Sequence, residues 1–235
     1  MNFSHQLRPY QPGPLGPQLW DRPNADIQQG AFSVVIMNPN VEVTSNVGFP
    51  LKTPQVVKVT HCPPSIVMLS QLAKEPGPPG LPRVTKCLGP TAVNQDNQVY
   101  WGFAIERLEG PKTQQQKNLL DGFLGEVDLL DKLLTTQGLR NWVHSAQLVD
   151  HLAAANLCGL RDAFAYLSKV IHQERAVLDL FREGNVLFDQ AGNLCLSDPI
   201  ALTWESEEQL APLKWAIDPQ GNTVLPPTAF KLSLT

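Results

Sequence analysis

The sequence is poor in charged residues and has no excess of positive charge. Only 17% of its 235 residues are Asp, Glu, Lys or Arg, below the roughly 25% of an ordinary globular chain. Eighteen lysines and arginines stand against 22 aspartates and glutamates, which gives a formal net charge of −4. A protein that holds nucleic acid nonspecifically needs a field of basic side chains around the phosphates. The composition therefore argues against direct nucleic-acid binding.

Long apolar runs and cysteine motifs are also missing. No apolar run approaches the roughly 18 residues of a membrane span, and residues 1–20 contain no apolar segment of the kind that directs export. No Cys-x-x-Cys pair occurs, and no histidine completes a zinc pattern. We therefore expect no membrane contact and a cytoplasmic protein with four reduced cysteines, namely Cys62, Cys87, Cys158 and Cys195.

Hydrophobic residues and proline are abundant. The hydrophobic share of 43% excludes wholesale disorder, and the length is ample for a sizeable core. Prolines number 21, nearly twice the usual share of about 5%, and several of them crowd into residues 1–23. Proline at such spacing blocks a helix and favours an extended chain. We therefore predict an extended arm over residues 1–23.

Strands and one helix are predicted between this arm and Gly110. Runs of β-branched and aromatic residues are typical of strands. Residues 64–75 open with a proline, place apolar residues on one stripe and end before a Pro-Gly pair, as a short helix does. The strands are expected at residues 31–37, 55–60, 83–88 and 99–105.

The composition changes after Gly110, where apolar residues recur every three or four positions, the spacing of amphipathic helices. We expect these helices at residues 116–136, 139–154 and 160–171. The chain is thus predicted to be α+β, with a strand-rich part (24–110), a helical part (111–204) and a tail (205–235). His144 and His151, seven residues apart on one helical face, are expected to have no carboxylate neighbours and are interpreted as surface or packing residues.

The stretch most informative about function is a predicted hairpin. Two short apolar runs, 186–188 and 194–196, flank a segment rich in turn formers. A hairpin sets the residue before its first strand beside those just after its second, here Asn185 and Asp198. An amide oxygen and a carboxylate can hold Mg²⁺, which completes its shell with water and phosphate oxygens. The alternative is that Asn185 closes a loop and Asp198 caps a turn before the next proline.

The spacing of these two residues resembles that of a protein kinase. Asn185 and Asp198 are thirteen residues apart across a strand-turn-strand, as are the catalytic-loop Asn and the DFG Asp that hold magnesium on ATP in kinases. The stretch GNVLFDQAGNLCLSDPI (184–200) looks most like the short kinase-like proteins of phages, including the early serine/threonine kinases of podoviruses. In these proteins an Asp-Pro pair commonly replaces DFG, and here that pair is Asp198-Pro199. The resemblance implies a compact two-lobed protein-kinase-like fold.

The nucleotide site that this resemblance implies begins with Gly30 and Lys58. Residues 27–36 are similar to the end of a glycine-rich loop, with Gly30 as its remaining glycine. The stretch VVKV (56–59) resembles the third strand of the small lobe, where Lys58 would contact the α- and β-phosphates. Burying an unpaired ammonium is costly, so a lysine among valines needs a reason. The alternative for Lys58 is an edge strand on which it faces solvent.

Two further stretches follow in the same order along the chain. Residues 80–89 resemble the fourth kinase strand, and residues 101–110 resemble the fifth strand with its hinge. The resemblance therefore implies that Glu106 and Leu108, at the hinge, contribute to the ATP site. The cofactors it implies are ATP and Mg²⁺.

The sequence departs from the kinase pattern at the catalytic base. Kinases carry an Asp five residues before the metal-binding Asn, but position 180 is Leu. The nearest carboxylate is Asp179, six residues before Asn185, and a one-residue insertion would still bring it to the substrate hydroxyl. Glu183 is a further candidate that would point along the loop toward solvent. Without any base, the protein would be a pseudokinase.

The helix-C glutamate and the activation segment also depart from the pattern. Glu75 lies at the very end of the predicted helix, and no APE-like motif follows Asp198. If active, the chain is predicted to transfer the γ-phosphoryl group of ATP to Ser or Thr of a host or phage protein in the host cytoplasm. The alternative is a catalytically inactive pseudokinase that binds such a protein and acts by occupancy. These departures and the Pro-rich ends favour the alternative.

Overall fold

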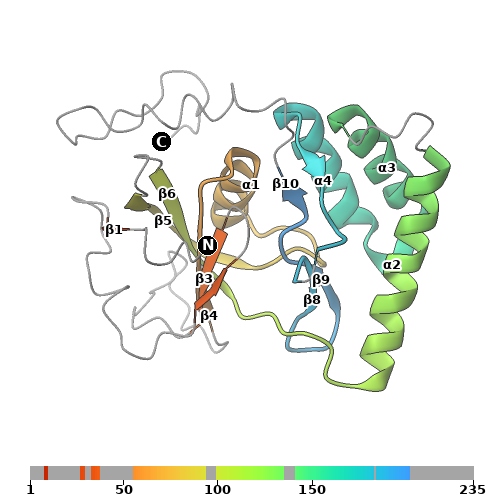
Figure 1. Ribbon diagram of the computed structural model, residues 1–235, viewed down its shortest axis with the longest axis horizontal. Coiled ribbons are helices and arrows are strands. Elements are labelled where there is room, and N and C mark those ends of the chain that lie inside the picture. The colour runs from red at the N-terminus through yellow and green to blue at the C-terminus, as the bar shows by residue number, and fades with distance from the viewer. Residues whose placement is uncertain are drawn as a thin grey trace. The chain divides into compact units, whose positions relative to one another are not determined.

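The computed structural model shows an α+β protein with one large antiparallel sheet and four α-helices among the described residues (Figure 1). It describes residues 8–9, 27–29, 33–37, 55–93, 99–134, 141–182 and 184–201. The chain divides into two compact units. The sheet unit contains the described residues up to Glu75 and Arg83–Arg107, and the helical unit contains Pro76–Pro82 and the described residues from Leu108 onward.

The sheet unit is built on six antiparallel strands in the order β1-β5-β6-β4-β3-β2. The four predicted strands are confirmed, and the third continues further than expected, to Val93. The strands are β1 (Arg8–Pro9), β2 (Ile27–Gln29), β3 (Ser33–Ile36), β4 (Gln55–Thr60), β5 (Val84–Val93) and β6 (Val99–Glu106).

The predicted N-terminal arm contributes to this sheet. Arg8 and Pro9 form the edge strand β1 and pair with Val93 and Ala92 of β5. An edge is the position in a sheet where proline is tolerated, because its missing N–H then costs no ladder hydrogen bond. The remainder of residues 1–23 lies outside the described residues.

The core of the sheet unit forms because β-branched residues alternate along its central strands. Val57 and Val59 of β4 are fully buried on one face, together with Ile36 and Tyr100. The predicted helix is confirmed as α1 (Pro63–Lys74), which starts with two prolines and buries Ile66, Met68 and Leu69. Proline favours a helix start, since the first turn leaves its N–H groups without helical partners.

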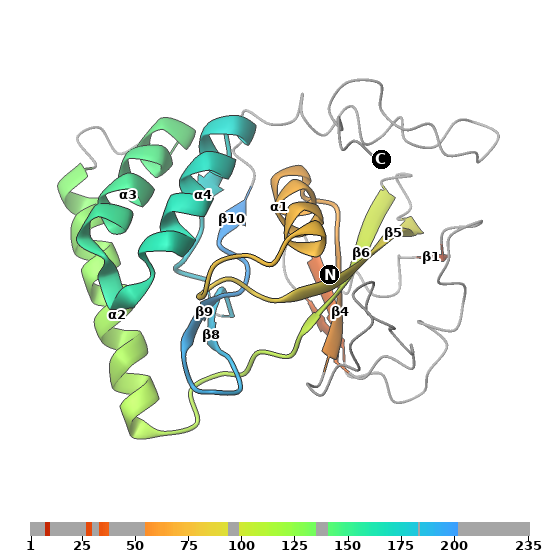
Figure 2. The ribbon, with the colours of Figure 1, turned by 180° about the vertical axis from the view of Figure 1, so that it is seen from behind.

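The helical unit contains the three predicted helices and four short strands. The helices are α2 (Gln114–Leu134), α3 (Trp142–Ala155) and α4 (Arg161–Glu174), with a 3-10 turn at Leu157–Gly159. They lie side by side in both ribbon views (Figures 1 and 2). The strands are β7 (Val177–Leu178), β8 (Val186–Phe188), β9 (Leu194–Leu196) and β10 (Ile200–Ala201).

Aromatic and aliphatic side chains fill the space between these helices. Phe123 of α2 stacks on Phe164 of α4, with ring centroids 6.3 Å apart and an interplanar angle of 8°. Leu152 and Leu167 are also fully buried. The start of α3 is capped by Asn141, whose Oδ1 accepts the His144 N–H at 2.9 Å. Such a cap satisfies one of the N–H groups that a helix start leaves without a helical partner.

Residues 76–82 are held against the helical unit by Gly80. Its carbonyl accepts the Leu196 N–H at 2.8 Å, its φ is +90°, and a Cβ on it would lie 2.3 Å from Leu160 Cδ2. We expect Gly80→Ala to lower the free energy of unfolding by about 1–3 kcal/mol, because it adds backbone strain and overpacking. Chemical denaturation measures this loss.

Gly125→Ala is the matched control for this substitution. Gly125 lies in α2, and a Cβ there would meet nothing within 4 Å. Alanine inside an exposed helix should stabilise the protein by about 0.5–1 kcal/mol. A Gly80→Ala protein as stable as the parent would show that the 76–82 segment is not packed in this way.

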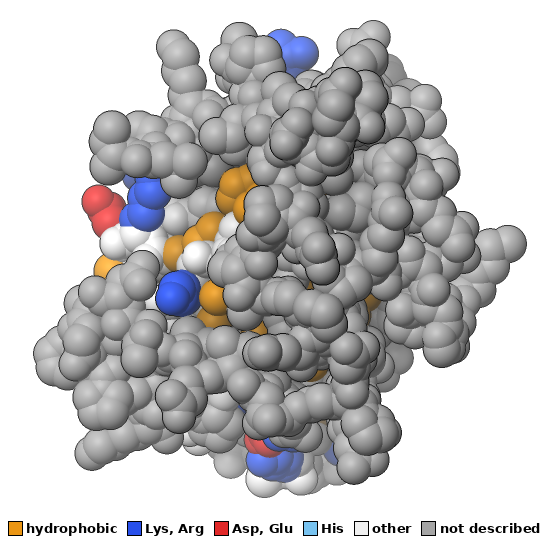
Figure 3. Space-filling model, turned by 90° about the vertical axis from the view of Figure 1, so that its left-hand side faces the viewer, with side chains coloured by type: hydrophobic (Ala, Val, Ile, Leu, Met, Phe, Trp, Pro, Cys, Tyr) orange, Lys and Arg blue, Asp and Glu red, His pale blue; other side chains and the backbone are white. Residues whose placement is uncertain are grey.

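The helices, the cysteines and the surface of the described residues show three further features. No helix in the described ranges is long and apolar enough to cross a membrane. All four cysteines are free thiols. On the face shown in Figure 3, hydrophobic side chains of described residues lie next to lysine or arginine side chains that stand apart from one another.

Candidate functional site

The predicted hairpin is confirmed as β8 and β9, which pair Val186 with Leu196 and Phe188 with Leu194. Its turn is closed by Asp189, whose Oδ1 accepts the Asn193 N–H at 2.8 Å. A carboxylate that binds a backbone N–H in this way is typical of a tight turn. This register places Asn185 and the residues after Leu196 at the same end of the hairpin.

Asn185 and Asp198 are joined through the backbone at that end. The Asn185 carbonyl accepts the N–H of Ser197 at 2.8 Å and the N–H of Asp198 at 3.4 Å. Asn185 is buried, whereas Asp198 is half-buried. The hairpin therefore brings together the backbones of Asn185 and Asp198, the two residues that the sequence suggested as cation ligands.

Asp179 is tied to the same end of the hairpin. Its N–H donates to the Pro199 carbonyl at 2.8 Å, and its own carbonyl accepts the Asn185 Nδ2–H at 2.6 Å. The pairing of β7 with β10, which sets Leu178 opposite Ile200, carries Asp179 to this position. The side chain of Asn185 thus connects Asp179 to the segment that leads to Asp198. We call Asp179, Asn185 and Asp198 the hairpin cluster.

Charge around the hairpin cluster is mixed. The Asp179 carboxylate, 19% exposed, forms an ion pair with the largely exposed Arg182, with Nε 3.0 Å from Oδ2. Leu180, at the position of the usual kinase base, is 1% exposed and carries no acid or base. The cluster therefore combines two carboxylates and an amide, and the guanidinium of Arg182 lies beside it.

A cation at this cluster would draw on only a few protein atoms. Within the described ranges, no three or more His, Cys, Asp or Glu side chains gather closely enough to hold a metal ion. Mg²⁺ is commonly held by one or two side-chain oxygens and completes its octahedron with water and phosphate oxygens. The donor set of Asn185 and Asp198 fits that ion when a phosphate is also bound.

Lys58 lies in the interior of the sheet unit. It pairs with Val35 of β3 and Phe103 of β6 and is 3% exposed. The alternative of a solvent-facing lysine on an edge strand is therefore wrong, because β4 has a neighbour on each side. Since side chains alternate along a strand, Lys58 lies on the sheet face opposite Val57 and Val59.

Gly30 lies outside the described residues. The strands on either side of it, β2 and β3, are antiparallel and pair Gln29 with Val34. The structure therefore does not test whether Gly30 belongs to a glycine-rich loop. Glu183, the further candidate for the base, is also outside the described residues.

The predicted hinge residues lie where the chain passes from one unit to the other. Glu106 ends β6, and its Oε1 accepts the Arg83 N–H at 2.7 Å. Leu108 is buried and belongs to the helical unit. The next residue, Glu109, exchanges two backbone hydrogen bonds with Phe188 of β8, at 3.0 and 2.8 Å. The backbone at the end of the predicted hinge is thus hydrogen-bonded to strand β8 of the hairpin.

Helix α1 carries no acidic residue along its length. Glu75 is its C-cap and is exposed, while Met68, Leu69 and Ser70 occupy the middle of the helix and are buried. The structure therefore agrees with the sequence that no glutamate lies in the middle of this helix, because the helix ends before Glu75.

A buried Asp-His pair was missed by the reasoning from sequence. The interpretation of His144 as lacking a carboxylate neighbour is wrong, since its Nε2 lies 2.7 Å from Oδ1 of Asp131. Asp131 follows Phe123 and Val127 at helical spacing, and all three are buried. A carboxylate on the apolar stripe of a helix was the available signal. His151 is exposed, as expected.

No protein-family model matches this chain, and comparison with curated proteins finds no significant match. Functional assignment therefore depends on the residues and geometry of the chain itself.

Proposed function

We propose that this chain is a kinase-like protein that transfers the γ-phosphoryl group of ATP to Ser or Thr of a host or phage protein. The observation that carries the proposal is the hairpin cluster, in which Asn185 binds the backbone of Asp179 and of Asp198. Phosphoryl transfer requires mainly positioning and neutralisation of charge, and a rigid set of oxygen ligands supplies both.

Each member of the cluster has one role in this proposal. Asn185 and Asp198 hold Mg²⁺, which neutralises phosphate charge when it is bound. Asp179 orients the substrate hydroxyl and accepts its proton. The extra residue between Asp179 and Asn185 does not separate them, because the Asn185 side chain still reaches the Asp179 carbonyl.

The sheet unit supports the nucleotide part of the proposal. Lys58 is on a central strand that is followed by α1, two more strands and the predicted hinge, in the chain order that the resemblance implies. A buried lysine is costly unless its charge is used, and phosphate oxygens are one such use. We therefore propose that Lys58 binds the α- and β-phosphates and that Glu106, Leu108 and Gly30 line the ATP site.

The second candidate is a pseudokinase that acts by binding a host or phage protein. It is favoured by α1, in which no glutamate is available to pair with Lys58, and by the ion pair that engages the Asp179 carboxylate. A binding module would need the fold of the chain but not its phosphoryl-transfer chemistry.

Asp179→Asn separates the two candidates. In an active kinase it should lower the rate of phosphoryl transfer by about 10²–10⁴-fold, the usual contribution of a general base. Nucleotide affinity should change little, because Asp179 contacts the hydroxyl and not ATP. The assay is labelling by γ-labelled ATP with Mg²⁺, alone and with host lysate, beside equilibrium binding of ATP.

The exposed Asp121 of α2 provides the control, as Asp121→Asn should leave both measurements unchanged. Full transfer activity in Asp179→Asn would remove Asp179 from the mechanism. No labelling by the parent protein, together with retained capture of a host protein, would instead support the pseudokinase. In that case deletion of residues 1–23 should weaken capture, since an extended Pro-rich segment loses little entropy when it docks. Because the deletion also removes strand β1, the truncated protein must keep the thermal melt of the parent for this comparison.

A further inference from the structure

We propose that Asp131 and His144 form a positioning pair that holds the segment Leu178–Phe181 and thereby directs the Asp179 carboxylate. The catalytic consequence of this inference rests on the proposed function, whereas its structural part does not. Neither residue is among those assigned to the binding of ATP, Mg²⁺ or substrate.

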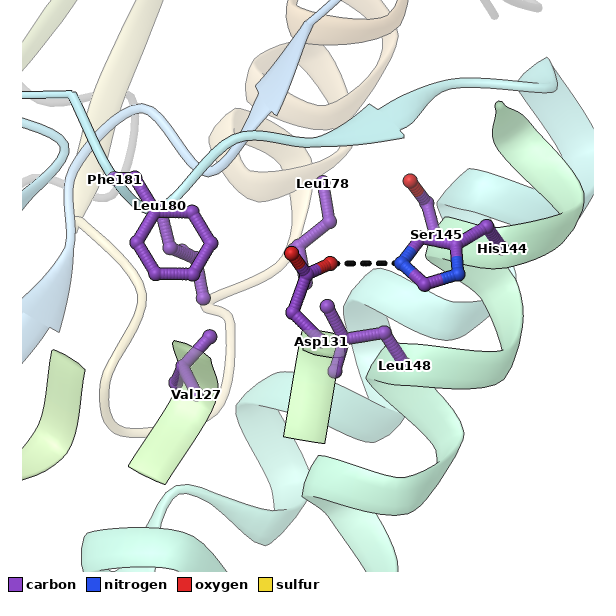
Figure 4. Close-up of a pocket in the computed structure, with 8 residues that line it drawn as sticks. All are labelled: Val127, Asp131, His144, Ser145, Leu148, Leu178, Leu180 and Phe181. Carbon is purple, nitrogen blue, oxygen red and sulfur yellow. Dashed lines mark hydrogen bonds and ion pairs between the residues drawn. The ribbon is translucent and has the colours of Figure 1, made fainter. Parts of the chain in front are cut away.

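The pair is buried between two helices and the segment that carries Asp179. Asp131 of α2 is 4% exposed and His144 of α3 is 8% exposed, and the carboxylate accepts a hydrogen bond from the imidazole at 2.7 Å. In Figure 4 the two side chains point toward each other, with Leu178, Leu180 and Phe181 around the side of Asp131 away from the helices.

The same residues line a small pocket of about 10 Å³ that is partly open to solvent. A pocket of this size has room for at most about one water molecule between the pair and the segment. A shift of the segment toward α2 or α3 would therefore meet the Asp131 carboxylate or the imidazole. The pair thus limits how far residues 178–181 can move toward the two helices.

Fixing Leu178 and Leu180 also fixes the direction of Asp179. Leu180 is fully buried, and Leu178 lies against the same cavity, whereas the Asp179 carboxylate between them is partly exposed and bound to Arg182. Leu178, Leu180 and Phe181 all line the pocket beside the Asp-His pair, whereas Asp179 does not. The side chains that hold the segment against the pair therefore leave the Asp179 carboxylate outside the pocket, where it binds Arg182.

Stability alone does not account for a polar pair at this place. Replacement of both partners of a buried hydrogen bond by apolar groups of similar shape is often nearly neutral or stabilising, because no buried polar group is then left without a partner. A hydrogen bond between Asp131 and His144 is directional, however, and therefore favours one arrangement of α2, α3 and the segment that packs beside them. Defined geometry, more than stability, is what a catalytic carboxylate requires.

The test measures amide hydrogen exchange of the full chain without nucleotide. The double substitution Asp131→Leu/His144→Leu removes the pair, and His144→Gln retains an N–H donor for Asp131. In the double variant, exchange of the Asp179 N–H, which donates to Pro199, should become at least roughly tenfold faster. Exchange within the β8–β9 hairpin should stay unchanged, and His144→Gln should behave like the parent.

Asp150→Asn is the matched control, because Asp150 is on helix α3 with His144 but forms exposed contacts with Ser168 and His172. It should leave exchange at Asp179 unaltered. Unchanged exchange at Asp179 in the double variant would overturn the inference, and so would acceleration spread equally over the hairpin, which is what a merely structural role predicts.

Kinetics supply the second readout. In the double variant the turnover rate should fall with ATP affinity unchanged, because the Asp179 carboxylate is held less accurately in its productive direction, whereas His144→Gln should retain activity. If the parent transfers no phosphoryl group, the proposed function fails while the exchange measurement still decides whether the pair positions Asp179. Normal turnover in a double variant with loosened exchange would overturn the catalytic part of the inference alone.

Discussion

Asp198→Ala is expected to lower phosphoryl transfer from ATP by about 10²–10³-fold or more, the usual cost of losing a preorganised electrostatic contact. Asp198 is the carboxylate that we propose as a ligand of Mg²⁺, and its N–H is bound to the Asn185 carbonyl. Its removal would take away the charged oxygen that this proposal assigns to Mg²⁺ beside the phosphates. Initial rates of labelling at several Mg²⁺ concentrations measure the effect.

The Mg²⁺ series makes this prediction specific. If Asp198 holds the metal, higher Mg²⁺ should partly restore the rate, and ATP binding in the presence of Mg²⁺ should weaken. Asp121→Ala, which removes an exposed carboxylate from α2, should change neither quantity. A protein whose biological effect survives Asp198→Ala intact, with a normal thermal melt, is not acting as a kinase.

Phe164→Ala is expected to cost about 3–5 kcal/mol of unfolding free energy, as truncation of a buried aromatic usually does. Phe164 is 0% exposed and stacks on Phe123, so the substitution removes apolar burial and leaves a cavity between α2 and α4. For a chain of this length the melting temperature should drop by about 2–4 °C per kcal/mol. Denaturant titration and thermal melts measure the loss.

Leu133→Ala is the comparison for Phe164→Ala. Leu133 is on α2 but is 68% exposed, so its truncation should stay within about 0.5 kcal/mol. Equal losses from the two substitutions would contradict the packing described for the helical unit. A large loss from Leu133→Ala alone would indicate that α2 has a partner on its exposed side.

Local sequence patterns were sufficient for the helices, for most strands and for the hairpin. Helix α1 was predictable because its opening prolines, apolar stripe and terminal Pro-Gly pair all lie within a short stretch of chain. The β8–β9 hairpin was predictable because turn formers separate two apolar runs. Such signals depend on residues close in sequence, and backbone periodicity alone converts them into structure.

The hairpin pattern alone, without any tertiary contact, predicts that Asn185 and Asp198 lie at the same end of the hairpin. The sequence left open whether Asp179, which lies six residues before Asn185 where the kinase pattern has five, would lie close to Asn185 and Asp198. That depended on the pairing of Leu178 with Ile200 and on the hydrogen bond from Asn185 to Asp179, both of which join residues of separate segments.

Tertiary structure decided which face and which neighbours each residue received. Lys58 could have been on an edge strand, and only the pairing of β4 with both β3 and β6 buried it. The Asp131–His144 pair joins two helices, and the sequence of each helix by itself predicts only that the helix is amphipathic. By itself the sequence determined the helices, most strands and the hairpin that brings Asn185 and Asp198 to one end, since periodicity and turn chemistry are local. Burial of Lys58 and the Asp-His pair required tertiary structure, because strand order and helix packing arise from contacts between distant segments.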